Sequence, residues 1–408
     1  MKKLPSIIIA LATVVISAKV VMVLAEAPNE ATAALQEQID DAKTNLDIVV
    51  VPGGDTAIND GITIPYQSGF VMEGIGASEL STSYAAALTG ASSRLTASGA
   101  DRVPMTLLTV NSAETAIRDL SINGYTETQR AAAAAKAACG ILLTKPSTGL
   151  ATGGLLLENA YVIGFETGIQ AAVGVTENNC ERSTFNKVRF HYDQAGFVCK
   201  SQQSMGFGFN DCEWFQNEDC IRVEGGGKIV VNNAFVHFLD DSEEHTFLRF
   251  APRVYNTSIG PNSGHFVING LYADAIAPDL KLVVMAQKDE SDVVVPYYTH
   301  TTFAGFHLSL ATYTEPSIEV AGWSTTTFRD GWGLHVDCAT WNNEPSGASK
   351  TISRLVFDNV MIWDAVDGED VVHEESARGE SYVIVSRCYN QFGAPITDFD
   401  GLVVGDVP

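Results

Sequence analysis

The chain has 408 residues, of which 46% are hydrophobic and only 18% are charged. Its 49 acidic residues against 25 basic ones give a formal net charge of −24. The composition excludes an intrinsically disordered chain. The acidic balance argues against nucleic acid or an anionic membrane surface as a partner, because both need basic patches on the protein.

The first 25 residues have the layout of a secretory signal peptide. A short basic start, M-K-K, precedes an apolar stretch from Leu4 to Ala25 that ends in V-L-A, an acceptable cleavage sequence. The stretch is also long enough to span a bilayer, so a retained signal-anchor is the alternative. In both cases we expect the rest of the chain to be secreted or held at the cell surface.

The segment 26–46 is predicted to contain a short amphipathic helix, because Leu35, Ile39 and Ala42 fall on one helical face. Strand-like runs follow it, each ending in turn residues. They are D-I-V-V-V-P-G-G at 47–54, I-T-I-P at 62–65 and G-F-V-M-E-G-I-G at 69–76.

A repeat is clearest after residue 185. Asn186, Asn210 and Asn233 can be placed in one column at steps of 24 and 23 residues, and each precedes an alternating strand. Steps of this size are what one coil of a three-stranded solenoid needs. The Asn column is interpreted as a ladder of stacked side chains at a turn, where Asn can hydrogen-bond the backbone.

The same alignment predicts which side chains face the interior. Positions two and four after the Asn column are predicted to point inward, and the alternate positions outward. Arg189 should then face Glu213 across rungs about 4.8 Å apart, which favours the register. The inward set is Val188, Cys212, Phe235, Phe190, Trp214 and His237, and the outward set is Lys187, Asp211, Ala234, Arg189, Glu213 and Val236.

The order of helix, strand with Pro-Gly, I-T-I-P and G-F-V-M-E-G-I-G, followed by these repeats, resembles the pectate-lyase superfamily. The family includes polysaccharide lyases and hydrolases and phage tailspikes. The resemblance implies an all-β fold: a single-stranded right-handed parallel β-helix over 47–408 with a short N-terminal capping helix. The usual P-P-G-T-Y of the family is replaced here by P-G-G-D-T at 52–56. Loop excursions are expected near 126–139 and 258–350.

The cysteines show no spacing typical of a zinc site. Several fall on predicted strand positions, where Cys behaves as a small apolar residue. We expect most of these cysteines to be buried thiols. One disulfide among them is the alternative. The seven are Cys139, Cys180, Cys199, Cys212, Cys220, Cys338 and Cys388.

No familiar catalytic motif is present. The resemblance implies either β-elimination, which needs a base and a cation, or glycoside hydrolysis, which needs two carboxylates. The column alignment brings acidic residues together after the strands, so we expect Asp193, Glu218, Asp240 and Asp241 to be the catalytic candidates. Glu218 and Asp241 are also candidate Ca²⁺ ligands. We expect no required cofactor. The alternative to a catalytic or Ca²⁺-binding role is that these acidic residues are solvated in an ordinary turn.

Four residues are predicted to contact a substrate. Arg189 and Glu213 lie on the outer strand face, where a surface ion pair is the alternative. Phe215 and Phe238 are expected to stack on sugar rings, or else to pack under a loop or against a sister subunit. The candidate bases are His191, His245, His300 and His373.

The leading functional hypothesis is a secreted or surface β-helix that binds or acts on polysaccharide, as a lyase or a glycoside hydrolase. The alternative is a non-catalytic structural or receptor-binding protein, such as a virion spike, a surface-layer component or an adhesin. Both rest on fold analogy. The resemblance also implies a homotrimer along the helix axis. Polysaccharide or a surface glycan is the expected partner, and nucleic acid is not.

Overall fold

The computed structural model describes residues 28–45, 47–66, 69–77, 92–126, 128–129, 132, 134–145, 153–174, 182–201, 205–238, 244–251, 262–275, 280–285, 297–310, 318–321, 323–334, 338–341, 352–363, 372–374 and 380–396. The predicted signal segment 1–25 lies outside the described residues. Within them, no helix is long and apolar enough to cross a membrane.

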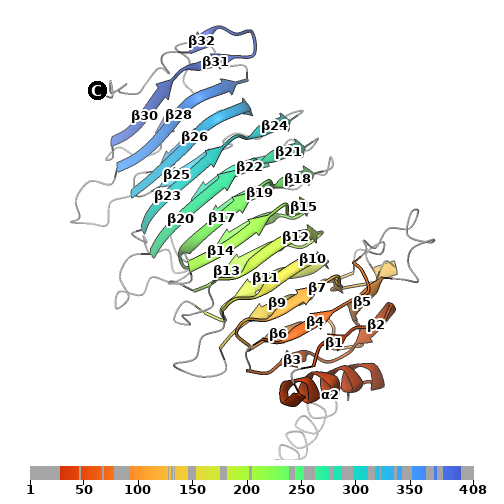
Figure 1. The fold of residues 1–408 in the computed structure, drawn as a ribbon. Helices are drawn as coiled ribbons and strands as arrows, with labels where there is room; N and C mark the ends of the chain where they lie inside the picture. Colours follow the sequence, from red (N-terminus) through yellow and green to blue (C-terminus); the bar gives the residue numbers. More distant parts are fainter. Residues whose placement is uncertain are drawn as a thin grey trace, which may run out of the picture.

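The described strands stack into a right-handed parallel β-helix, as predicted (Figure 1). A coil contains three strands joined by turns. In one central coil these are β14 (Met205–Asn210), β15 (Glu213–Phe215) and β16 (Asp219–Val223). The next strand, β17 (Gly227–Asn232), returns to lie parallel on β14. Each coil therefore covers the one before it, and the core grows along the axis.

The third strand of each coil belongs to an 11-stranded parallel sheet, here called sheet B. Its strands follow in stacking order: β3 (Ile62–Ile64), β6 (Thr106–Val110), β9 (Ala137–Leu143), β11 (Phe165–Ala171), β13 (Ala195–Cys199), β16, β19 (His245–Phe250), β22 (Leu280–Met285), β25 (Ile318–Ala321), β27 (Cys338–Trp341) and β29 (Val372–Glu374).

The first and second strands of each coil form two stacks of a 21-stranded sheet, here called sheet A. The first stack contains β1 (Val49–Val50), β4 (Val71–Glu73), β7 (Ala116–Arg118), β14, β17, β20 (Asn262–Asn269), β23 (Tyr297–Ala304) and β30 (Glu380–Ser386). The second contains β2 (Gly54–Ile58), β5 (Ser93–Ala97), β8 (Ser121–Asn123), β15, β18 (Phe235–Phe238), β21 (Tyr272–Ala275), β24 (His307–Leu310) and β31 (Cys388–Asn390). Four long strands run through both: β10 (Leu156–Ile163), β12 (Thr184–His191), β26 (Trp323–Leu334) and β28 (Ile352–Ile362).

Described strands continue through both regions in which loop excursions were predicted. Strands β20 to β27 continue the solenoid through the region near 258–350, where coils with loop excursions were predicted. Of the excursion predicted near 126–139, the last three residues already belong to β9. The last described strand, β32 (Pro395–Ile396), pairs antiparallel with β31, unlike the parallel pairs of the other described strands.

The predicted Asn ladder is present, but one member was wrong. The side-chain amide of Asn210 donates to Asn186 at 2.9 Å, and Asn232 donates to Asn210 at 2.9 Å. Asn269 continues the ladder with a 3.0 Å bond to Asn232. Asn232, and not Asn233, is therefore the third member. A chain segment with two consecutive Asn residues gives the sequence alignment no means of choosing between them.

Asn233 belongs to the turn that joins the first and second strands of a coil. Its φ is 56°, and the equivalent residues Lys187 and Asp211 have φ of 53° and 52°. Asn and Asp tolerate this left-handed conformation better than most residues. The Asn233 side chain donates to Asp211 at 3.1 Å, so this turn has its own link between neighbouring coils.

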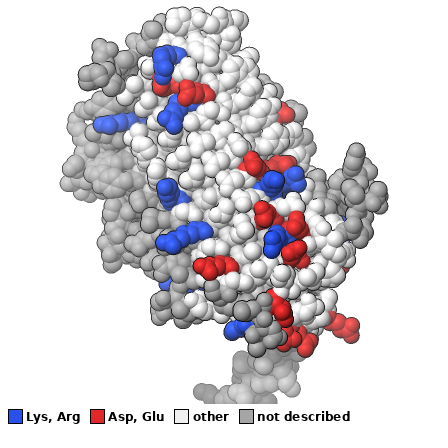
Figure 2. All heavy atoms as spheres, in the orientation of Figure 1, with Lys and Arg blue, Asp and Glu red and all other residues white. Residues whose placement is uncertain are grey.

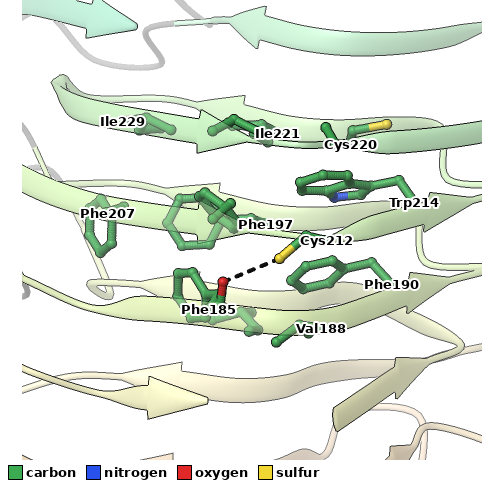
Figure 3. Packing of buried hydrophobic residues seen from close by; sticks show 14 of the residues in the cluster. Phe185, Val188, Phe190, Phe197, Phe207, Cys212, Trp214, Cys220, Ile221 and Ile229 are labelled. Carbon is green, nitrogen blue, oxygen red and sulfur yellow. Dashed lines mark hydrogen bonds between the residues drawn. The ribbon is translucent and has the colours of Figure 1, made fainter. Parts of the chain in front are cut away.

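The interior is filled by aromatic and branched side chains (Figure 3). Val188, Phe190, Cys212 and Trp214 all point inward, as predicted, and the rings of Phe190 and Trp214 stack 5.4 Å apart. Fully burying one such large side chain contributes about 1.5–3 kcal/mol. Gly196 makes room for the indole, because a Cβ there would lie 2.9 Å from its ring atoms.

In the next coil the one-residue error reverses the predicted faces. Val236 pairs with Trp214 and is buried, although it was predicted to point outward. Phe235 and His237 point outward instead of inward, and Ala234 is buried. A shift of one residue moves every side chain of a strand to the opposite face.

Helix α2 (Glu30–Asn45) covers the open end of the first coils, at the lower end of Figure 1. Its buried face includes Leu35, Ile39 and Ala42, as the helical periodicity predicts. Gln36 accepts a hydrogen bond from the backbone N–H of Thr63 and donates one to its carbonyl, both at 2.9 Å. One side chain thus imitates a neighbouring strand at the exposed edge of β3.

Five cysteines of the described residues are buried thiols outside any disulfide: Cys139, Cys199, Cys212, Cys220 and Cys388. Burial raises the pKa of Cys139 and of Cys212 to about 12. The Cys212 thiol points toward the carbonyl of Phe185 at 3.3 Å (Figure 3). These thiols are packing residues. Cys180 lies outside the described residues.

Candidate functional site

Asp193 lies inside the β-helix. Its side chain is fully buried, and Oδ1 accepts a hydrogen bond from the backbone N–H of Phe165 at 2.8 Å. Oδ2 has no hydrogen-bond partner among the described residues. Burial therefore raises the pKa of Asp193 well above its ordinary value. A carboxyl in this position cannot touch a polysaccharide, so the geometry does not support the predicted catalytic role.

The register of β16 with β19 differs from the one that the sequence alignment assumed. β16 pairs with β19 so that Asp219 lies opposite Thr246, which places Glu218 level with His245. The alignment missed this because the segment between β18 and β19 is longer than the one it assumed. Asp240 and Asp241 lie outside the described residues, so their predicted roles remain predictions.

Asp219, which the sequence reasoning did not select, anchors the charges on the outer face of sheet B. Its side chain is nearly fully buried, and each oxygen has its own arginine. Arg222 Nε donates to Oδ2 at 2.6 Å, and Arg249 Nε donates to Oδ1 at 2.7 Å. The two guanidinium groups are held by one carboxylate, which fixes their positions.

Glu244 and Lys281 extend this network to the next coil. Arg249 donates to Glu244 at 3.1 Å, and Lys281 lies 3.1 Å from the other Glu244 oxygen. Burial alone would raise the pKa of Glu244, but the hydrogen bonds and charges of Lys281 and Arg249 outweigh it, and the pKa is lowered. Burial alone would lower the pKa of Arg249, but Asp219 and Glu244 raise it. Both groups stay charged near neutral pH.

These side chains line a hollow on the surface. Glu218, Asp219, Arg222, Glu244 and Arg249 surround a cavity of about 390 Å³. Arg222 also lines a second cavity of about 340 Å³ that runs back across β13, β11 and β9. The polar lining of the second cavity includes Glu166, Thr167, Gln170, Gln194, Lys200 and Glu224. We call the two together the charged groove.

The groove has two rows of outward side chains that the register explains. Asp219 lies opposite Ala195 and Thr246, and Arg222 lies opposite Val198 and Arg249. Successive coils therefore bring Arg222 and Arg249 side by side although they are 27 positions apart in the chain. The signal in the sequence was the acidic residue three positions before Arg222, which a search for carboxylate pairs does not pick out.

Arg189 and Glu213 meet on the opposite side of the coil, as predicted. Arg189 Nε donates to Glu213 at 3.1 Å, and its NH1 group donates to the Tyr161 hydroxyl at 2.7 Å. His191 Nε2 lies 3.4 Å from the other Glu213 oxygen. Burial alone would raise the pKa of Glu213, but His191 and Arg189 outweigh it, and the pKa is lowered. Every member of this cluster already has a partner within the protein.

The two predicted sugar-stacking rings differ. Phe215 is half-buried and stacks on His237, with ring centroids 5.3 Å apart. Phe238 is fully buried and stacks on His245 at 4.2 Å. Phe238 therefore cannot stack on a sugar, because it is the inward member of β18 in the corrected register.

Metal binding gains no support from the described residues. Among them, no three His, Cys, Asp or Glu side chains are grouped so as to hold a metal ion. The candidate Ca²⁺ site at Glu218 and Asp241 stays a prediction, because Asp241 lies outside the described residues. On the surface shown in Figure 2, some acidic and basic side chains lie in small mixed groups and others lie singly, with broad uncharged areas between them.

Comparison with known proteins shows the fold. No protein-family model and no curated protein matches the chain. The catalytic domain of Agl-KA is similar with a TM-score of 0.56 and 9% identity, over 92% of this chain and 66% of that one. The catalytic unit of a thermostable GH87 α-1,3-glucanase from Streptomyces thermodiastaticus strain HF3-3 has a TM-score of 0.53 and 12% identity, over 90% and 67%.

A more distant similarity, with a TM-score of 0.47 and 10% identity, is to the A-module of the Azotobacter vinelandii mannuronan C-5 epimerase AlgE6. The chain spans about two thirds of the first two structures. At these identities the likeness shows the fold alone. The chain has the pectate-lyase type of parallel β-helix, and the solved structures similar to it are carbohydrate-active β-helix enzymes.

Proposed function

We propose that the protein binds polysaccharide in the charged groove on the outer face of sheet B, outside the cytoplasm. The observation that supports this most is the arrangement of Asp219 between Arg222 and Arg249. It presents fixed hydrogen-bond donors beside carboxylate acceptors in an open hollow. Sugar hydroxyls both donate and accept, so a surface of alternating donors and acceptors suits them.

The groove also has the extent that a chain-like ligand needs. Its two cavities share Arg222 and together cross six strands of sheet B, β6, β9, β11, β13, β16 and β19. Because rungs are about 4.8 Å apart, a polymer lying along the axis meets equivalent groups coil after coil. One similar structure is by its name an α-1,3-glucanase, which adds fold-level support for a glycan ligand.

Glycoside hydrolysis is the second candidate, because two carboxyl groups, Glu218 and Glu244, line the same cavity. Glu244 is held ionised by Arg249 and Lys281, as a base or nucleophile must be. In this scheme Glu218 is assigned as the proton donor, because it is the second glutamate that lines the cavity. If the protein is an adhesin or another non-catalytic binding protein, the same groove binds the polysaccharide and no bond is cleaved.

The test is affinity electrophoresis of the chain from residue 26 onward in gels that contain neutral or acidic polysaccharides. The groove variant Arg249→Met keeps the apolar stem and removes the charged group. We expect it to weaken retention about tenfold, since a hydrogen bond to a charged group contributes about 1.5–3 kcal/mol. Arg387→Met is the matched control, because Arg387 is an exposed arginine that pairs with Asp358 on the surface.

Equal retention of the two variants, or no retention of the parent chain on any polysaccharide, would overturn the proposal. Release of reducing ends by the parent chain, abolished in Glu218→Gln and Glu244→Gln, identifies a hydrolase. Unsaturated ends identify a lyase instead. Retention without any product identifies a binding protein.

A further inference from the structure

A row of exposed rings runs along the second stack of sheet A, away from the charged groove. Backbone pairing places Phe235, Tyr272, His307 and Trp332 on four successive coils at one position. Phe235, Tyr272 and Trp332 are 36%, 40% and 40% exposed. We call these four residues the aromatic row.

The rings overlap without covering one another. Centroids are 5.4 Å apart from Phe235 to Tyr272, 5.2 Å from Tyr272 to His307 and 4.4 Å from His307 to Trp332. The planes of the first two pairs differ by 10° and 25°. Carbon atoms in contact lie about 3.5–4.0 Å apart, so near-parallel rings at more than 5 Å are displaced sideways. Part of each ring face therefore remains open to solvent.

A second row of polar side chains runs beside the rings, two residues further along each strand. His237, Asp274 and Ser309 occupy this position on the coils of Phe235, Tyr272 and His307. His237 and Asp274 lie 3.7 Å apart and are partly exposed. Apolar ring faces thus alternate across the strand with groups that donate and accept hydrogen bonds.

The charge of this surface limits its ligand. Among the described residues of the two rows, none from Phe235 to Trp332 is a lysine or arginine. Two coils before Phe235 at the same position, Arg189 is paired with Glu213 at 3.1 Å. On a protein of net charge −24, an acidic polymer would meet repulsion here and no lysine or arginine within the two rows. A second copy of this chain, docked on the aromatic row, would bring the same negative charge. Packing of its apolar surface on the rings would not use the polar row beside them.

We propose that the aromatic row is a second glycan-binding surface, which takes an uncharged polysaccharide. Pyranose C–H groups pack against the open ring faces, whose negative quadrupole attracts them. Sugar hydroxyls reach His237, Asp274 and Ser309. This inference rests on the proposed polysaccharide binding and adds a ligand class and a second contact surface to it.

The test compares Tyr272→Ala and Trp332→Ala in gels that contain a neutral glucan or a polyuronate. Each variant should lose about fivefold or more in retention by the neutral glucan, the effect of losing one aromatic contact of about 1 kcal/mol. Phe392→Ala is the control, because Phe392 is 86% exposed in the turn before β32 and belongs to neither row. Circular dichroism checks that all three variants keep the parent strand content.

Three results would overturn the inference. The first is neutral-glucan retention that matches the control. The second is stronger retention of the parent chain by the polyuronate that falls in the row variants. The third is an oligomer in sedimentation that Trp332→Ala dissociates while glucan retention is unchanged, which assigns the row to a second copy. If Arg249→Met loses glycan binding while Tyr272→Ala and Trp332→Ala keep it, the aromatic-row proposal is refuted and the charged-groove proposal stands. If the parent chain binds no glycan, both proposals are refuted.

Discussion

Burial of the Asp193 carboxyl raises its pKa, and this has a measurable cost in stability. A carboxyl whose pKa is higher in the folded state stabilises the fold only while it is protonated. Stability should therefore fall as the pH rises from the unfolded pKa, near 4, through the folded pKa. Asp193→Asn keeps the acceptor for the Phe165 N–H and removes the ionisable group. We expect it to stabilise the protein by about 1–3 kcal/mol at pH 7.

The measurement is urea unfolding from pH 4 to pH 8, in which Asp193→Asn should show a smaller decline with pH than the parent chain. Asn217 provides the reverse experiment, because it occupies the same buried position one coil later. Asn217→Asp should introduce a second decline with pH. An Asp193→Asn variant less stable than the parent at pH 7 and equally pH-dependent would contradict the account.

Asp219 is the residue on which the groove depends. Asp219→Asn leaves Arg222 and Arg249 without their shared negative charge in a half-buried site. Breaking a buried ion pair in this way costs about 3–5 kcal/mol, and the partial exposure of the arginines favours the lower figure. Chemical denaturation checks the loss.

Asp358→Asn is the matched change at the surface, where Arg387 is largely exposed. Exposed ion pairs contribute little to stability, so this variant should unfold at nearly the same denaturant concentration as the parent chain. Equal effects of the Asp219 and Asp358 substitutions would show that the groove carboxylate is not a buried anchor.

At the scale of the strand and turn, the Asn ladder links four coils through side-chain amides. Asn210 is a central member that donates to Asn186 and accepts from Asn232, so Asn210→Ala removes two bonds. At about 1 kcal/mol each, the expected loss is about 2 kcal/mol. Among the described residues, Asn269→Ala removes one side-chain bond, which Asn269 donates to Asn232, and thermal unfolding should show a smaller loss. The reverse order would contradict a continuous ladder.

The contact between the capping helix α2 and β3 can be tested by removing the side chain of Gln36. Gln36→Ala removes both hydrogen bonds to Thr63 and leaves the edge of β3 without a partner from α2. We expect a stability loss of about 1–2 kcal/mol and a rise in association measured by light scattering, because an uncovered strand edge pairs with other chains. Gln38→Ala, an exposed change on the same helix, should have neither effect.

The same elements show what the sequence could predict and what it could not. The alternation around Phe190 and Trp214 predicted the buried face correctly, because strand periodicity depends on local order alone. The register of the next coil was wrong by one residue at Asn232 and Asn233, since either Asn satisfies the repeat. From that error followed the wrong faces for Phe235 and Val236 and the misplaced role of Phe238.

For the whole molecule, the fold was predictable because each coil repeats the same short pattern and packs only on its neighbours. The charged groove was not, because its residues come from different coils separated by loops of unequal length. Asp219 and Arg249 meet only once the segment between β18 and β19 is given its true length. The aromatic row was hidden for a different reason, because the one-residue error at Asn232 and Asn233 assigned its first member, Phe235, to the core.

The most direct test of the central claim is a crystal structure of the protein soaked with oligosaccharides of a polysaccharide that it binds in solution. The account predicts sugar rings in the charged groove across β16 and β19, with hydroxyls on Arg222 and Arg249 and on the neighbouring carboxylates. An empty groove at saturating oligosaccharide, in crystals that leave it open to solvent, would contradict the claim that sheet B carries the glycan site.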